Sequence, residues 1–172
     1  MNPDLASRMS ALGDAPDESG FGAPPADFHE EIRAIHEYWC SKRVCDRIPD
    51  RSDVDPVVEI PRLLGNVWLL DVETDPRRFR YRLLGSNLTS ASTRPKTGSY
   101  LDEQPGSRTI STTLASIEKC CDTQTPFWRK GWPQLIHDRF VPTLEYILLP
   151  LSVDRSKDTR MLMNLTIYNW QK

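Results

Sequence analysis

An alternation of apolar and basic residues marks the clearest element in the chain. Residues 78–84 have the sequence RFRYRLL, which places Phe79, Tyr81 and Leu83 on one face of a strand and three arginines on the other. The preceding apolar run, residues 66–73, ends in an acidic turn that contains a proline. The two segments together predict an antiparallel hairpin.

Three later segments also have the pattern of strands. Residues 125–134 contain several aromatic residues, residues 143–153 form a long apolar run, and residues 159–170 alternate apolar with more polar positions. Residues 107–122 are predicted to form a helix, because their apolar residues recur at helical spacing. Strands arranged on both sides of a helical middle predict an α+β fold with an antiparallel sheet.

The chain is expected to begin with a flexible tail and a helix. Residues 1–26 are rich in proline, glycine and acidic residues, which is typical of a segment that buries little surface. Over residues 28–40, the apolar positions are spaced by four, three and four residues and form one stripe. The stripe must be buried, either on the chain's own sheet or on the same helix of a second subunit. Its members are Phe28, Ile32, Ile35 and Trp39.

The overall charge excludes one class of function. The chain has 22 basic and 24 acidic residues, a net charge of −2, which is not the charge of a dedicated nucleic-acid-binding protein. No apolar run approaches the length of a membrane span, about 18 residues. The N-terminal residues lack the continuous apolar stretch of a secretory signal, so we expect a cytoplasmic protein with reduced cysteines.

Candidate chemistry is sparse. The four cysteines and three histidines have no zinc-ligand spacing, and the chain has neither a nucleophile elbow nor a glycine-rich phosphate loop. We therefore expect no enzyme.

Of the adjacent Cys120 and Cys121, one is expected to pack in the core. Asp53 and Asp55 are expected to cap local backbone amides. Glu145, at the start of an apolar strand, needs a partner.

The carboxylate of Glu145 has two possible partners. A cross-strand ion pair with an arginine of the sheet, Arg80 or Arg82, is an ordinary stabilising contact in β-sheets. The alternative is a polar contact between the carboxylate and a bound ligand. The first interpretation is favoured here because cross-strand pairs of opposite charge are common.

Several phrases in this order resemble a family of small bacterial PAS-domain proteins, over about residues 28–170. They are YW at 38–39, IPDRSDVDP at 48–56, IPRLLGNVWLLDVE at 60–73, FRYRLLGS at 79–86, TG at 97–98 and LEYILLPLS at 144–152. The resemblance implies a PAS-like five-stranded antiparallel sheet with helices packed on one face, preceded by an N-terminal helix. It also implies one domain over residues 27–172, and a role in sensing or protein–protein regulation.

The resemblance places a ligand pocket between the sheet and the helix at 107–122. The alternation of residues predicts a mainly apolar lining, so the expected ligand is small and apolar or aromatic. The predicted lining residues are Tyr81, Leu83, Leu114, Ile117, Trp128, Leu148, Met163 and Leu165. The helix at 107–122 has no histidine and residues 86–94 have no cysteine, so neither haem nor a photochemical flavin is expected.

Members of the PAS superfamily that resemble this chain often dimerise through their N-terminal helix. We therefore expect a homodimer that uses the apolar stripe at 28–39 together with an exposed patch of the sheet, and an unidentified signalling partner. Two alternatives remain open. The chain could be a structural adaptor with a filled core, or an enzyme whose site lies in a similar α+β fold.

Overall fold

One antiparallel sheet organises the chain. The computed structural model describes residues 17–88, 95–103, 107–131 and 143–169. Within them, six strands lie in the order β1-β4-β5-β6-β2-β3. The strands are β1 (Glu18–Phe21), β2 (Val67–Glu73), β3 (Arg78–Leu84), β4 (Phe127–Gly131), β5 (Thr143–Leu151) and β6 (Met161–Asn169). The α-helices are α2 (Glu30–Ser41), α3 (Pro56–Glu59) and α4 (Ser107–Thr123), and the 3-10 helices are η1 (Arg51–Asp53), η2 (Pro61–Asn66) and η4 (Leu101–Glu103).

The α+β fold and the five predicted strands are confirmed. Each predicted strand corresponds to one of β2 to β6, and all their pairings are antiparallel. The first and last of them, β2 and β6, are neighbours, as expected. The predicted helix at 107–122 is α4, and it packs on the sheet. Period-2 alternation and apolar runs were sufficient to locate these elements.

A sixth strand corrects two expectations, the five-stranded sheet and the flexible tail at 1–26. β1 lies inside that predicted tail and pairs with β4, with Glu18 opposite Lys130 and Phe21 opposite Phe127. The strand has only four residues and most of its side chains are exposed, so it has no apolar pattern to detect. Residues 1–16 lie outside the described residues.

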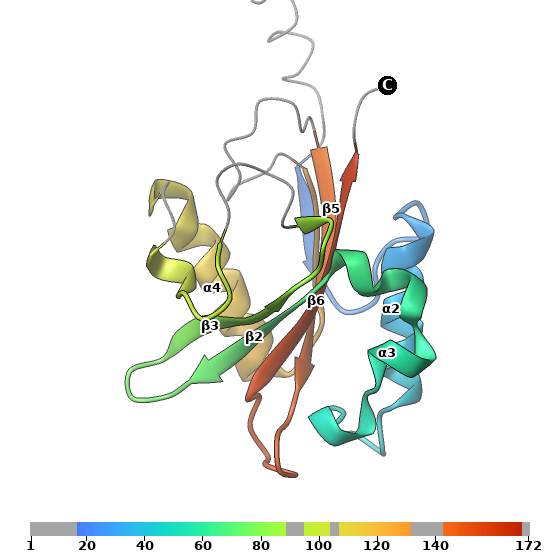
Figure 1. The fold of residues 1–172 in the computed structure, drawn as a ribbon, viewed down its shortest axis with the longest axis horizontal. Coiled ribbons are helices and arrows are strands. Elements are labelled where there is room, and N and C mark those ends of the chain that lie inside the picture. Colours follow the sequence, from blue (N-terminus) through green and yellow to red (C-terminus); the bar gives the residue numbers. More distant parts are fainter. Residues whose placement is uncertain (1–16, 89–94, 104–106, 132–142, 170–172) are drawn as a thin grey trace, which may run out of the picture.

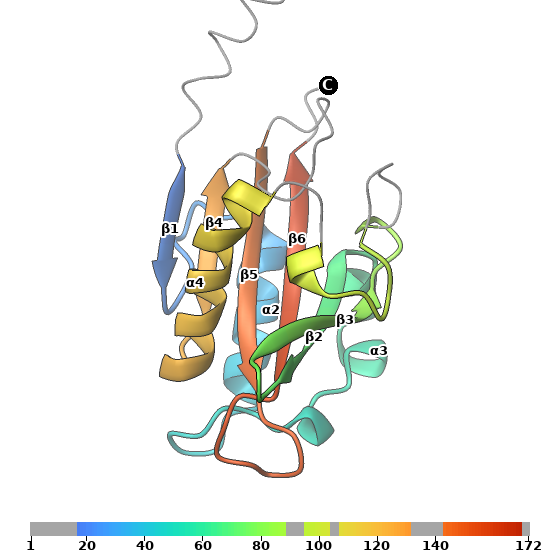
Figure 2. The same ribbon diagram turned by 90° about the vertical axis from the view of Figure 1, so that its left-hand side faces the viewer.

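Helices cover both faces of the sheet, which corrects the expectation that they share one face. Helix α2 packs on one face and α4 on the other (Figures 1 and 2). The reason lies in the central strands: every residue of β5 from Ile147 to Leu151 and every residue of β6 from Met161 to Ile167 is buried. Strands that are apolar on both sides need cover on both sides.

The sheet therefore separates two hydrophobic cores. The α2-side core contains Phe28, Ile32, Ile35, Trp39, Ile48, Val54, Leu63, Val67, Leu69, Ile147, Leu149, Leu151, Met161, Met163, Leu165 and Ile167. The α4-side core contains Trp68, Leu70, Val72, Phe79, Tyr81, Leu101, Ile117, Cys120, Cys121, Phe127, Leu148 and Leu162. Consecutive residues of β6 alternate between the two cores.

The apolar stripe before and along α2 belongs to the chain's own core. Phe28, Ile32, Ile35 and Trp39 are each at most 2% exposed. The indole Nε1 of Trp39 also donates a hydrogen bond of 2.8 Å to the carbonyl of Pro150 in β5. This corrects the expectation that the four residues form a dimer interface, because the sheet already buries them. The homodimer itself stays a prediction.

Glu145 joins α2 to the sheet through a different partner from the one expected. Its carboxylate accepts a hydrogen bond of 2.6 Å from the backbone amide of His29, the residue at the N-terminus of α2. Lys130, directly opposite in β4, lies 3.5 Å from the carboxylate. The predicted partners, Arg80 and Arg82, lie in β3 at the far side of the sheet and pair with Asp71 instead.

The core position of the stripe leads to a prediction about stability. Replacing fully buried Ile35 by alanine should lower the free energy of unfolding by about 2–5 kcal/mol, because the substitution removes buried methyl groups and leaves a cavity. The control is Val58, which is 73% exposed, and Val58→Ala should change the free energy of unfolding by no more than about 0.5 kcal/mol. Urea unfolding measures both. Equal, small effects would show that Ile35 is not a core residue of the monomer.

Candidate functional site

A fully buried amide lies in the sheet beneath α4. Alternation along β6 places Asn164 on the same face as Leu162 of the α4-side core. The Asn164 side chain is 0% exposed, and its amide nitrogen makes two long hydrogen bonds, 3.4 Å to the carbonyl of Trp68 and 3.3 Å to that of Leu162. Its amide oxygen Oδ1 is buried without a hydrogen-bond donor among the described residues.

Neighbouring polar groups, by contrast, satisfy one another. The indole Nε1 of Trp68 donates a hydrogen bond of 3.0 Å to the hydroxyl of Thr166, two residues beyond Asn164 on the same face. The ring of Trp68 packs against Tyr81, with 5.7 Å between the ring centroids. The indole N–H of Trp68 therefore donates to Thr166, and it does not donate to the Oδ1 atom of Asn164.

Two phenols are also associated with the α4-side core. Tyr81 belongs to the α4-side core and Tyr146 packs against it. Burial raises the pKa of Tyr146 to about 12 and raises that of Tyr81 as well. Both phenols are thus neutral at physiological pH and can donate or accept hydrogen bonds. Small-molecule sites typically combine an apolar lining with a few polar groups, and these are the residue types of the α4-side core.

Arg129 brings a positive charge to the edge of this region. It lies in β4, opposite Tyr146 of β5, and is only 5% exposed. Its guanidinium pairs with the carboxylate of Asp17, 2.9 Å away, just before β1. The N-terminal segment thus supplies the counter-charge for a buried cation.

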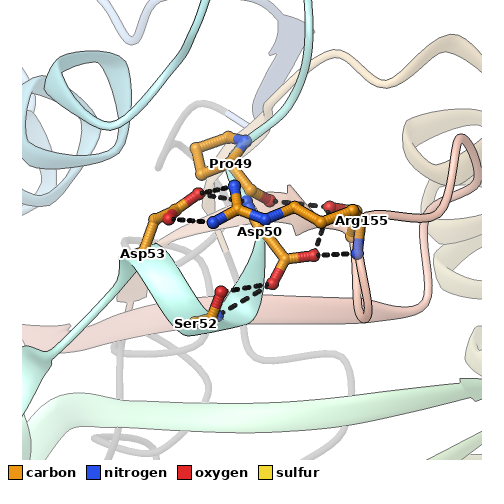
Figure 3. A network of polar contacts seen from close by, with 6 residues as sticks. Pro49, Asp50, Ser52, Asp53 and Arg155 are labelled. Atoms are coloured by element: carbon orange, nitrogen blue, oxygen red, sulfur yellow. Dashed lines mark hydrogen bonds and ion pairs between the residues drawn. The ribbon is translucent and has the colours of Figure 1, made fainter.

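A second polar cluster lies beyond the other end of β5 and centres on the buried Asp50 (Figure 3). The Asp50 carboxylate accepts four hydrogen bonds: 3.0 Å from the Ser52 amide, 2.7 Å from the Ser52 hydroxyl, 2.9 Å from the Ser152 hydroxyl and 2.7 Å from the Arg155 amide. Burial alone would raise the pKa of Asp50, but these donors outweigh it and lower the pKa to about 2.

Asp53 extends the cluster to the surface. Its two carboxylate oxygens pair with the guanidinium of Arg155 at 2.7 and 2.8 Å, and one of them accepts a weak bond from the Asp50 amide at 3.4 Å. The predicted capping role of Asp53 is confirmed, and so is that of Asp55, which accepts from the Val58 amide at 3.3 Å. The cluster fastens η1 to the turn between β5 and β6, so we interpret it as structural.

The eight predicted lining residues do not share one face. Tyr81, Ile117 and Leu148 lie in the α4-side core and Leu114 packs against it, so these four are together. The other four lie elsewhere: Met163 and Leu165 are in the α2-side core, Trp128 packs against that core, and Leu83 is 43% exposed.

Two physical causes explain the misplaced residues. In β3, a bulge pairs Leu83 with Leu69 and Tyr81 with Leu70, leaving Arg82 as the extra residue, so the alternation reverses between Tyr81 and Leu83. In β6, apolar residues occur on both faces, so the sequence does not distinguish the face of Met163 from that of Asn164, and a shift of one residue exchanges them. Asn164 itself was missed, although a polar residue in an apolar strand was a usable signal.

Two of the four cysteines, Cys120 and Cys121, are buried, whereas Cys40 and Cys45 are exposed. Both Cys120 and Cys121 pack in the α4-side core, which corrects the expectation that only one does. Burial raises the pKa of Cys121 to about 12. Among the described residues, no group of three or more His, Cys, Asp or Glu side chains could hold a metal ion. Within the same residues, no helix is long and apolar enough to cross a membrane.

Comparison with known proteins gives one match. A family model described as a PAS domain matches residues 27–166, which is most of the chain. The match begins just before α2 and ends within β6, so it includes Asn164 and the Asp50 cluster and excludes β1. No curated protein and no solved structure matches the chain.

The low pKa of Asp50 predicts a pH-dependent contribution to stability. A carboxyl group whose pKa is lower in the folded state stabilises the fold above its unfolded pKa, and the contribution is lost as the pH falls toward the folded value. Asp50→Asn should therefore reduce the free energy of unfolding by about 1–3 kcal/mol at pH 7. The difference from the wild type should shrink between pH 4 and about 2. Urea unfolding across this range measures it.

A matched control separates this effect from a general loss of charge. Asp158 is exposed and has only a loose ion pair of 3.7 Å with Arg160, so Asp158→Asn should have a small effect at every pH. If the difference between Asp50→Asn and the wild type stays constant from pH 4 to pH 2, the Asp50 carboxylate does not carry the proposed contribution.

Proposed function

This chain belongs to the PAS domain family, and from that premise we propose that it is a regulatory module that binds a small ligand between its sheet and α4. PAS domains are typically sensory rather than catalytic. In this proposal the ligand occupies the α4-side interior, beside Asn164, Tyr81 and Leu148. Binding there changes how the domain interacts with a signalling protein.

The observation that supports the proposal is the amide oxygen of Asn164. It is buried and has no donor among the described residues. A buried polar atom without a partner costs about 1–3 kcal/mol of stability, so such atoms are rare and call for an explanation. A ligand with an N–H or O–H group would supply the missing donor and recover this free energy on binding.

The surroundings narrow the chemical class of the ligand. The contacts available from Trp68, Ile117 and Leu148 are apolar or aromatic, which favours a small aromatic or aliphatic body. The amide oxygen of Asn164 lacks a donor among the described residues, and the phenols associated with this core are neutral, which favours an uncharged donor on the ligand. We therefore propose a small, largely apolar molecule that carries one N–H or O–H group.

The output of the module is proposed to be a protein–protein contact. A ligand between the sheet and α4 touches both, so it biases the position of the helix against the strands. The stripe of α2 is buried in the chain's own core and is not available for this contact. A homodimer, if it forms, must use other surfaces. A cytoplasmic location remains part of this proposal.

Substitution of Asn164 tests the role of the amide directly. In the ligand-free protein, Asn164→Leu should leave the free energy of unfolding unchanged or raise it by up to about 1 kcal/mol. The substitution removes an oxygen that has no donor among the described residues, and the two hydrogen bonds of the amide nitrogen that are lost with it are long, 3.3 and 3.4 Å. Thr166→Val is the matched control, since it removes the acceptor of Trp68 Nε1 and should cost about 1–3 kcal/mol. Chemical unfolding of the two variants beside the wild type gives the comparison.

A thermal-shift screen of small aromatic alcohols, phenols and amides provides the second arm. Compounds that raise the melting temperature of the wild type should fail to do so for Asn164→Leu. Destabilisation of Asn164→Leu by more than about 2 kcal/mol would instead mean that the amide is needed for the fold. A neutral Asn164→Leu together with no active compound would favour the structural adaptor with a filled core.

A further inference from the structure

The outermost strand on the β4 side is β1, which is short and mostly exposed. Three of the four residues of β1 are exposed, and the strand adds to the edge of β4 by backbone pairing (Figure 2). Gly22, directly after the strand, has a φ of 98° and donates a hydrogen bond of 2.8 Å to the carbonyl of Pro126. Backbone pairing of this kind accepts any extended segment, so specificity must come from side chains.

The first such contact recognises an acid. Asp17 lies just before the first residue of β1, beside Gly131. Its two carboxylate oxygens lie 2.9 and 3.0 Å from the buried guanidinium of Arg129. A Cβ atom on Gly131 would come within 2.7 Å of the Asp17 carboxylate, so the glycine leaves the space through which the acid reaches Arg129. A segment without an acid at this position would lose this ion pair with the Arg129 guanidinium, so an acid is favoured there.

The second contact requires a glycine and an aromatic residue. Gly20 lies opposite Trp128, and a Cβ atom on Gly20 would come within 2.5 Å of a ring carbon of Trp128. Phe21 packs on Phe127 with 5.1 Å between the ring centroids, and the ammonium group of Lys119 lies 4.5 Å from the centroid of Phe21. The edge thus selects an acid three residues before a glycine–aromatic pair.

One group at this edge is not satisfied by β1. The indole Nε1 of Trp128 is buried and has no acceptor among the described residues. A segment that followed the same path with a slightly different backbone position could offer it a carbonyl. β1 therefore fits the edge of β4 without using every group that the edge presents.

From these contacts we propose that the edge of β4 is a strand-binding site for a partner protein. The partner presents an extended segment with the pattern Asp-x-x-Gly-aromatic, which replaces β1 and pairs with β4. The charge of Arg129 favours the aspartate of the pattern, and the ring of Trp128 favours the glycine. Residues 17–21 are the chain's own copy of this pattern. This inference does not depend on a ligand beside Asn164.

Competition with β1 sets the conditions for exchange. A tethered segment has an effective concentration in the millimolar range, so a free segment binds weakly until the tethered strand is weakened. Removing the carboxylate of Asp17 should do this, because it takes away the ion pair with Arg129 while leaving the rest of the chain unchanged.

Binding of a labelled peptide to the full chain tests the proposal. The peptide has the sequence of residues 15–23, APDESGFGA, and fluorescence anisotropy measures its affinity. The Asp17→Ala protein should bind it at least tenfold more tightly than the wild type. Two altered peptides are compared with the parent peptide. In one, the aspartate is replaced by asparagine, and in the other, the glycine that corresponds to Gly20 is replaced by valine. Each should bind the Asp17→Ala protein at least tenfold more weakly than the parent peptide.

A disulfide that locks β1 in place provides the control. Glu18 and Lys130 are directly opposite in the two strands, so Glu18→Cys with Lys130→Cys can join them, in a chain with Cys40→Ser and Cys45→Ser. The oxidised protein should not bind the peptide, and reduction should restore the affinity of the unlocked strand. Because the same protein is measured before and after reduction, a folding defect would affect both states.

Three outcomes would overturn the proposal. One is equal affinity of the oxidised and reduced proteins, which would place the peptide elsewhere. Another is no binding by the Asp17→Ala protein at millimolar peptide, or no loss with the altered peptides. The third is an oxidised protein that migrates as a covalent dimer without reductant, which would assign the edge of β4 to the β1 strand of a second copy.

Discussion

Strands β5 and β6 have no face that meets water over most of their length, and this constraint organises the rest of the structure. A strand that is apolar on both sides must be covered on both sides, so α2 and α4 are placed on opposite faces of one sheet. The stripe of α2 then belongs to the core, and no apolar face of that helix is left for a second subunit.

The face under α2 is fastened by specific polar contacts. The indole of Trp39 donates to the backbone of β5, Glu145 accepts from the N-terminus of α2, and Asp50 accepts four hydrogen bonds at the turn between β5 and β6. These contacts fix the N-terminal half of the domain to the sheet. The face under α4 contains the amide oxygen of Asn164, which has no donor among the described residues. The indole Nε1 of Trp128 in β4 also lacks a partner among these residues, but Trp128 packs against the α2-side core and not beneath α4. We assign the rigid support to the first face and the ligand to the second.

Much of the fold was predictable because the strands carry strong local patterns. The hairpin of β2 and β3 and the apolar runs of β5 and β6 were located to within a few residues. The faces were not predictable. A one-residue bulge at Arg82 reverses the alternation in β3, and the apolar residues on both sides of β6 hide its orientation. β1 was missed because three of its four residues are exposed and the strand depends on the edge of β4 for its structure. Four of the eight predicted lining residues therefore lie on the α4 side of the sheet, and the ligand site itself stays a prediction.

Native mass spectrometry of the full chain, purified without denaturation from its own cells, tests the central claim most directly. The account predicts a species whose mass exceeds that of the polypeptide by one small molecule. The excess mass should disappear on acid denaturation and be absent from Asn164→Leu. A wild-type protein that has only the mass of the polypeptide, even after incubation with a small-molecule extract of the same cells, would contradict the assignment of a ligand site beneath α4.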